Sequence, residues 1–180
     1  MAFDAFLKID GIDGESTDAQ HQGWIDILSF QWGVGRGLNS PTGGAASLFG
    51  GFGNTQQANT GGALVPAVQS PPEAAFRFLK LVDSASPQIF LKLADGAAIK
   101  QATLTCRKAG GDQTSAGALA DFLKITFSDV LVSGFTDGGQ IATDPQPMEQ
   151  VSLNFTKIEI DVVGPQGTPV SASADLFVKH

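Results

Sequence analysis

VSLNFTKIEIDVV, residues 151–163, carries the pattern that decides the fold. Its apolar side chains recur at every second residue, as in a β-strand with one buried face. They hold odd positions as far as Phe155 and even positions from Ile158 onward. A shift of one residue moves every side chain of a strand to the other face, so the apolar face changes sides near Thr156. The stretch predicts a β-bulge or a strand that crosses between two sheets.

Period-two alternation recurs elsewhere in the chain and predicts further strands within residues 3–10, 101–108 and 119–132. The stretch WIDILSFQW, Trp24–Trp32, instead carries large apolar side chains on both faces. Such a pattern is typical of a strand that is covered on both sides, so we expect a central strand there. Residues 71–83 fit a helix or a strand equally well, and their pattern alone does not decide between them.

One short amphipathic helix is predicted from Ser86 to Asp95. We expect Ser86 as its N-cap, Pro87 at its first helical position and Gly96 as its C-terminal stop. A chain of 180 residues is long enough to bury one sizeable core, so we expect a single domain over 1–180. Many short strands, one helix and frequent glycine turns favour a mainly β barrel or sandwich with a helix on its flank.

The charge balance limits the partners. A formal net charge of −7 and a pI near 4.6 argue against nucleic acid and against an anionic membrane surface, which both attract clustered Lys and Arg. Charged residues interrupt every apolar stretch among the first thirty residues, so we expect neither a signal peptide nor membrane insertion. Cys106, the only cysteine, has no internal partner for a disulfide. Synthesis in the cytoplasm is the resulting expectation.

Three glycines, Gly33, Gly35 and Gly37, follow a predicted strand and superficially resemble a dinucleotide-binding loop. That fingerprint requires a helix directly after the glycines, and residues 38–41 predict none. The histidines, His21 and His180, are expected at the surface and Cys106 in the core. We expect no catalytic residue, no cofactor and no metal, and therefore no enzyme.

Two cations, Arg107 and Lys108, stand at the end of a predicted strand and precede Gly110 and Gly111. The glycines favour an ordinary turn between strands. The alternative is that the two cations contact an acidic partner.

Five stretches together resemble one known family. MAFDAFLKIDGIDGEST, IDILSFQWG, DSASPQIF, LTCRKAGG and PMEQVSLNFTKIEIDV match, in order and spacing from Met1 to about Val162, the Hcp family, the tube-forming haemolysin-coregulated proteins of bacterial type VI secretion. The resemblance implies a partly open β-barrel of two antiparallel sheets with one short flanking α-helix, similar to phage tail-tube subunits. It also implies that residues 74–83 form a strand.

The same resemblance implies a function. The chain is expected to form homohexameric rings that stack into the inner tube of the secretion system and carry or chaperone effectors in the lumen. Sheath, spike (VgrG) and effector proteins are the implied partners, and secretion from the bacterial cytoplasm without a signal peptide is the implied route. The alternative is a monomeric β-sandwich binding module that recognises a protein or a sugar through its loops. The two differ in mass in solution.

A glycine-rich segment, residues 33–70, is longer than the family leads us to expect and contains one charged residue, Arg36. We expect a long loop that docks on a neighbouring subunit or ring, with three apolar anchors, and the alternative is a passive tether. The residues predicted at subunit or ring interfaces are Trp24, Ile25, Ile27, Arg36, Leu48, Phe49, Phe52, Arg107 and Lys108.

Overall fold

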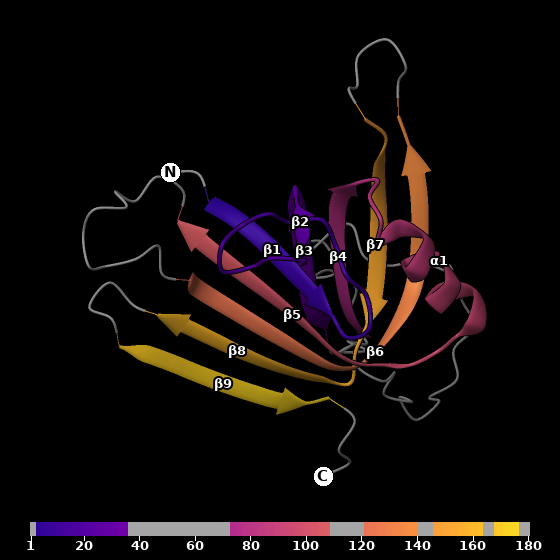
Figure 1. Cartoon of the computed structure of the whole chain (residues 1–180). Coiled ribbons are helices and arrows are strands. Elements are labelled where there is room, and N and C mark those ends of the chain that lie inside the picture. The colour runs from indigo at the N-terminus through magenta and orange to yellow at the C-terminus, as the bar shows by residue number, and fades with distance from the viewer. Residues whose placement is uncertain (1–2, 36–72, 109–120, 140–145, 164–167, 177–180) are drawn as a thin grey trace, which may run out of the picture.

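Two layers of antiparallel strands with one flanking helix make up the computed structural model of the chain (Figure 1). The structure describes residues 3–35, 73–108, 121–139, 146–163 and 168–176. The elements in these ranges are β1 (Phe3–Ile9), β2 (Ile25–Ile27), β3 (Ser29–Gly35), β4 (Glu73–Leu81), α1 (Ser86–Asp95), β5 (Ile99–Lys108), β6 (Asp121–Gly138), β7 (Met148–Asn154), β8 (Lys157–Val163) and β9 (Pro169–Asp175).

The strands form two connected layers. Sheet A has the order β2-β1-β5-β6-β8-β9, and sheet B has the order β6-β7-β4-β3. The 18-residue strand β6 belongs to both, because its first half pairs with β5 and β8 and its second half pairs with β7. The hydrogen-bonded path from β2 to β3 does not close, so the architecture is the partly open barrel that the resemblance implied.

The predicted crossing of the stretch 151–163 is confirmed. Strand β7 ends at Asn154 in sheet B, and β8 begins at Lys157 in sheet A. Val151 and Ile158 are both buried in the same core although their positions differ in parity. The change of sides therefore marks a change of sheet.

The expected central strand at Trp24–Trp32 is wrong. This stretch divides at Leu28 into β2, which pairs with β1, and β3, which pairs with β4, at the two ends of the strand path. Ile25 and Ile27 pack into the core from sheet A, whereas the even-numbered Phe30 and Trp32 pack against it from sheet B. Large side chains on both faces thus reflect a change of sheet and not cover on both sides.

Residues 73–81 form strand β4, as the resemblance implied, and the helix has the predicted bounds. Gly96 ends α1 in the left-handed conformation, with φ 61°. The prediction of Ser86 as N-cap is wrong, because Ala85 holds that position. The Ser86 hydroxyl instead accepts hydrogen bonds from the Asp83 amide at 3.0 Å and from Lys80 Nζ at 3.1 Å. The Ser86 hydroxyl thus stabilises the turn that precedes the helix.

Candidate functional site

Two of the three predicted interface residues on the Trp24–Trp32 stretch, Ile25 and Ile27, face the core of their own chain. Ile25 and Ile27 are 0% and 8% exposed and belong to the main hydrophobic cluster. Trp24 is half-buried. Arg36, Leu48, Phe49 and Phe52 lie outside the described residues.

The two cations at the end of β5 differ from one another. Lys108 is exposed, whereas Arg107 is buried and ion-paired with Asp18. The Arg107 guanidinium donates to both carboxylate oxygens of Asp18, with Nη1 3.1 Å from Oδ1. Arg107 is thus engaged within its own chain, and the interface role of both cations stays a prediction.

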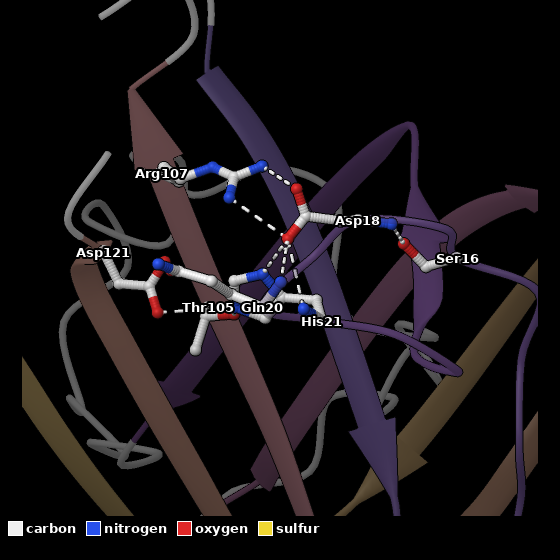
Figure 2. Close-up of polar contacts among 7 residues, drawn as sticks. All are labelled: Ser16, Asp18, Gln20, His21, Thr105, Arg107 and Asp121. Carbon is white, nitrogen blue, oxygen red and sulfur yellow. Dashed lines mark hydrogen bonds and ion pairs between the residues drawn. The ribbon is translucent and has the colours of Figure 1, made fainter. Parts of the chain in front are cut away.

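Residues 13–24, called the covering loop below, lie over the outer face of sheet A (Figure 2). His21 is its innermost polar residue at 3% exposed, so the prediction of a surface imidazole is wrong for His21, whereas His180 lies outside the described residues. The ring stacks on Phe6 of β1 at 4.3 Å between centroids and meets the edge of Trp24 at 4.8 Å. These two aromatic contacts stabilise the buried ring by packing.

Polar contacts join the covering loop to two further strands (Figure 2). His21 Nδ1 lies 3.0 Å from Asp18 Oδ1, and His21 Nε2 lies 3.0 Å from the Thr105 hydroxyl of β5. The same Nε2 lies 3.4 Å from Asp121 Oδ2, at the start of β6. One imidazole thus connects the loop with β5 and β6.

The Asp18 carboxylate and the Arg107 guanidinium shift each other's pKa. The Arg107 hydrogen bonds, with smaller contributions from His21 and the Gln20 amide, hold the pKa of Asp18 well below its usual range, although burial acts in the opposite direction. Asp18 in turn raises the pKa of Arg107. Burial, with a smaller contribution from Asp121, raises the pKa of the Cys106 thiol to about 11. The predicted burial of Cys106 is confirmed at 0% exposed.

The sequence of contacts Thr105, His21, Asp18 has the order of a hydroxyl nucleophile, a base and an orienting carboxylate. A nucleophile must, however, be reachable by its substrate. Thr105 is 4% exposed and lies beneath the covering loop. Its hydroxyl therefore holds the loop in place, and the arrangement gives no support for acyl transfer.

A second buried charge cluster fixes the start of α1. Lys80 and Glu149 are both 0% exposed, and Lys80 Nζ lies 2.6 Å from Glu149 Oε1. The ammonium also donates to Asp83 Oδ1 at 2.7 Å and to the Leu81 carbonyl at 2.8 Å. The Ala85 amide donates to the same Asp83 oxygen, so the cluster ties β4, β7 and the helix start together.

Strand β9 extends sheet A beyond the part that sheet B covers. The register aligns Val170 with Val162, Leu123 and Cys106 across β9, β8, β6 and β5. Along this row the exposed fraction rises from 0% at Cys106 to 41% at Val162 and 68% at Val170. The apolar face of sheet A therefore continues past the core into solvent.

No group of three or more His, Cys, Asp or Glu side chains with the spacing of a metal site occurs in the described ranges. In the same part of the chain, no helix has the length and apolar character needed to span a membrane.

Neither buried cluster was foreseen from the sequence. Asp18, Asp121 and Glu149 stand in no recognisable motif, and their partners are far away along the chain: 89 residues separate Asp18 from Arg107. The one local signal was the three-residue spacing of Asp18 and His21, which suits a carboxylate that binds both the His21 amide and its ring.

Comparison with known proteins gives consistent matches. A family model described as "Type VI secretion system effector, Hcp" matches residues 6–162. Protein hcp1 of Pseudomonas aeruginosa is 34% identical over 161 residues, which cover 89% of this chain and 83% of that protein. The crystal structure of Hcp1 from Salmonella typhimurium is similar with a TM-score of 0.70 and 30% identity, over 98% of this chain and 96% of the other. The crystal structure of a type VI secretion system effector from Yersinia pestis is similar with a TM-score of 0.67 and 26% identity, over 96% of this chain and 99% of the other.

Proposed function

The chain belongs to the Hcp family of type VI secretion proteins, and we propose that it acts there as a tube subunit whose hexameric rings stack into the inner tube. Members of this family are ring-forming, secreted structural components of the type VI system, which agrees with the expectation that the chain is not an enzyme. The alternative of a monomeric β-sandwich binding module is not favoured by these matches.

The observation that carries ring assembly is the uncovered apolar face of β9. All seven residues of this strand are exposed, and it pairs only with β8 among the described strands. A strand that alternates apolar and polar residues is patterned for burial of one face. Its free edge and the exposed Val170 and Val162 therefore fit a contact with a second copy of the chain, because an exposed strand edge is a template for pairing.

The opposite side of the molecule also exposes apolar residues. Phe90 and Leu91 on α1 are 53% and 56% exposed, and Leu131 on β6 is 45% exposed. Figure 1 places α1 and β9 at opposite sides of the fold. Two different exposed apolar surfaces on one subunit suit a head-to-tail contact between copies. Such a contact forms a ring when the rotation from one subunit to the next closes on itself.

The finer parts of the proposal concern partners and route. The tube lumen carries or chaperones effectors, the rings contact the sheath and the spike protein VgrG, and the chain leaves the bacterial cytoplasm through the type VI system without a signal peptide.

Sedimentation of the purified chain tests the ring. We expect a species of about six chain masses and annular particles in negative stain. Val170→Lys should dissociate it, because burial of an unpaired ammonium is costly. Ser173→Lys is the matched control, since it adds the same charge to the other face of β9, opposite Glu159. A wild-type chain that sediments as a folded monomer contradicts the proposal.

A further inference from the structure

Helix α1 is apolar on two sides. Its inner side holds the buried Ile89 and the partly buried Leu93, which pack against the core. A surface helix normally presents polar residues on the opposite side. The outer side of α1 instead exposes apolar residues at the spacing i, i+3, i+4 and i+7, which places them on one face: Pro87, Phe90, Leu91 and Ala94. This outer face indicates a helix that is covered on both sides.

The outer face of α1 is already held in position within the single chain. The exposed ring of Phe90 packs in a T-shaped arrangement against Phe135 of β6, with 6.0 Å between the ring centroids. The buried cluster of Lys80 and Glu149 ties Ser86, at the start of the helix, to β4 and β7. A surface that is ordered beforehand loses little conformational entropy when it binds. A fixed aromatic side chain in such a surface is typical of a protein contact.

A second uncovered apolar face lies on β8 and β9. Three cross-strand pairs of apolar side chains share one side of these strands: Val162 with Val170, Ile160 with Ala172, and Ile158 with Ala174. Ile158 is buried in the core, so the whole set points to the inner side of sheet A. The charged residues of the two strands alternate with this set and lie on the outer side. Over the described lengths of β8 and β9, the inner face therefore carries no charged side chain.

The two faces are alike in length and complementary in relief. From Pro87 to Ala94 the helix rises by about 11 Å. From Val170 to Ala174 the strand extends over about 13 Å. The two alanines of β9 form a low surface, which leaves room for the large side chains that α1 exposes. Their contact would bury no unpaired charge from either face, so it avoids the main penalty of burial.

These two faces do not meet within one chain, because α1 and β9 lie at opposite sides of the fold (Figure 1). A contact between two helices, or between two copies of β9, would cover one kind of face and leave the other in water. A contact of α1 with β8 and β9 of the next copy covers both kinds. We propose that the outer face of α1 docks on the inner face of β8 and β9 of the neighbouring copy and is the repeating contact of the ring. This assignment rests on the ring assembly proposed above and names the two surfaces that form it.

Lysine substitutions on either face test the contact. Leu91→Lys and Val170→Lys each place an ammonium where the contact would bury it without a partner. Both residues are exposed in the single chain, so the urea midpoint of each variant should equal that of the wild type. Each variant alone should sediment as a folded monomer, about sixfold lighter than the wild-type ring. Gln88→Lys, at an exposed position of α1 outside the outer face, is the control and should keep the ring.

A mixture of the two variants isolates the head-to-tail contact. The Leu91→Lys chain keeps its β8–β9 face, and the Val170→Lys chain keeps its helix face. One intact contact therefore remains between unlike chains, and the pair has no intact face left with which to add a third chain. The equimolar mixture should sediment at about two chain masses, with both variants in equal amounts. A mixture that stays monomeric would overturn the proposal, because the two faces then do not bind one another.

Failure of this contact and failure of ring assembly give different results. A wild-type chain that sediments as a folded monomer overturns both. Rings of wild-type mass in Leu91→Lys overturn the assigned contact alone, since α1 then faces a partner other than a second copy. Dimers of either variant on its own also overturn the assignment, because they show a contact between like faces.

Discussion

The hydroxyl of Thr156 donates a hydrogen bond to Asp129 Oδ2 at 3.0 Å, and it joins the two points at which strands change sheets. Thr156 lies between β7 and β8, where the chain crosses from sheet B to sheet A. Asp129 lies on β6 where that strand passes from its partners in sheet A to β7 in sheet B. The Thr156 amide also donates to the Ser128 carbonyl at 3.2 Å. Strand β6 and the connection from β7 to β8 therefore pass from one sheet to the other at the same corner.

At this corner Asp129 has a φ of 51°, in the left-handed region. We therefore expect valine at this position to destabilise the fold more than glycine does. Asp129→Val should destabilise the fold by about 1–2 kcal/mol or more, because a β-branched residue is strained in the left-handed region. Asp129→Gly should cost less, since it relieves the strain and loses only the hydrogen bond. Urea unfolding of the two variants measures the difference. Equal losses in both variants would show that backbone strain does not matter there.

The buried ion pair predicts that a double substitution is milder than a single one. Lys80→Met leaves the carboxylate of Glu149 buried without its cation and should cost about 3–5 kcal/mol. Adding Glu149→Leu should recover most of that loss, because no unpaired charge remains at this position. Denaturant unfolding of the complete cycle measures the coupling. Lys100→Met removes an exposed lysine and serves as control, with a change within about 0.5 kcal/mol.

Cys106 should behave as a core hydrophobe. Its thiol stays protonated at neutral pH, since its pKa is raised to about 11, and the residue is 0% exposed. A thiol reagent at pH 8 should therefore react only after denaturation. Cys106→Val should be tolerated with a loss below about 1.5 kcal/mol, whereas Cys106→Ser should cost more because it buries a hydroxyl. Rapid labelling of the native chain would contradict the predicted inertness.

The ion pair of Asp18 with Arg107 predicts that the stability of the fold decreases at acidic pH. The pKa of Asp18 is lowered on folding, so its contribution is present above the unfolded value of about 3.9 and is lost as the pH falls. Asp18→Asn should therefore be clearly less stable than the wild type at pH 7. The difference should shrink toward pH 3.5, where the Asp18 carboxyl of the unfolded chain gains its proton while that of the folded chain stays ionised. Urea midpoints of both chains at pH 7, 5 and 3.5 check this.

Deletion of residues 42–60 tests the glycine-rich segment. If Leu48, Phe49 and Phe52 anchor one ring on the next, the deletion should leave rings intact and shorten or abolish tubes. Replacement of these three residues by serine keeps the length of the segment and should have the same effect, because only the apolar anchors are lost. Ring mass and tube length are measured separately by sedimentation and electron microscopy. Unchanged tubes in both variants would leave the segment as a tether.

The sequence by itself determined much of the secondary structure. The parity change between Phe155 and Ile158 predicted the crossing, since strand periodicity depends only on neighbours along the chain. The helix bounds followed from Pro87 and Gly96 for the same reason. The error at Trp24–Trp32 was avoidable, because the apolar residues change parity there too, between Ile27 and Phe30.

Tertiary structure alone decided what is buried among the polar residues. Whether His21 faces water or lies under a loop depends on Phe6, Thr105 and Asp121, and no local pattern links it to those positions. The same holds for Lys80, which lies on the same core-facing side of β4 as Phe76 and Phe78. Its burial is tolerated because Glu149, 69 residues later, supplies the opposite charge. A buried charge is tolerated only where its partner arrives, and that meeting is a property of the fold.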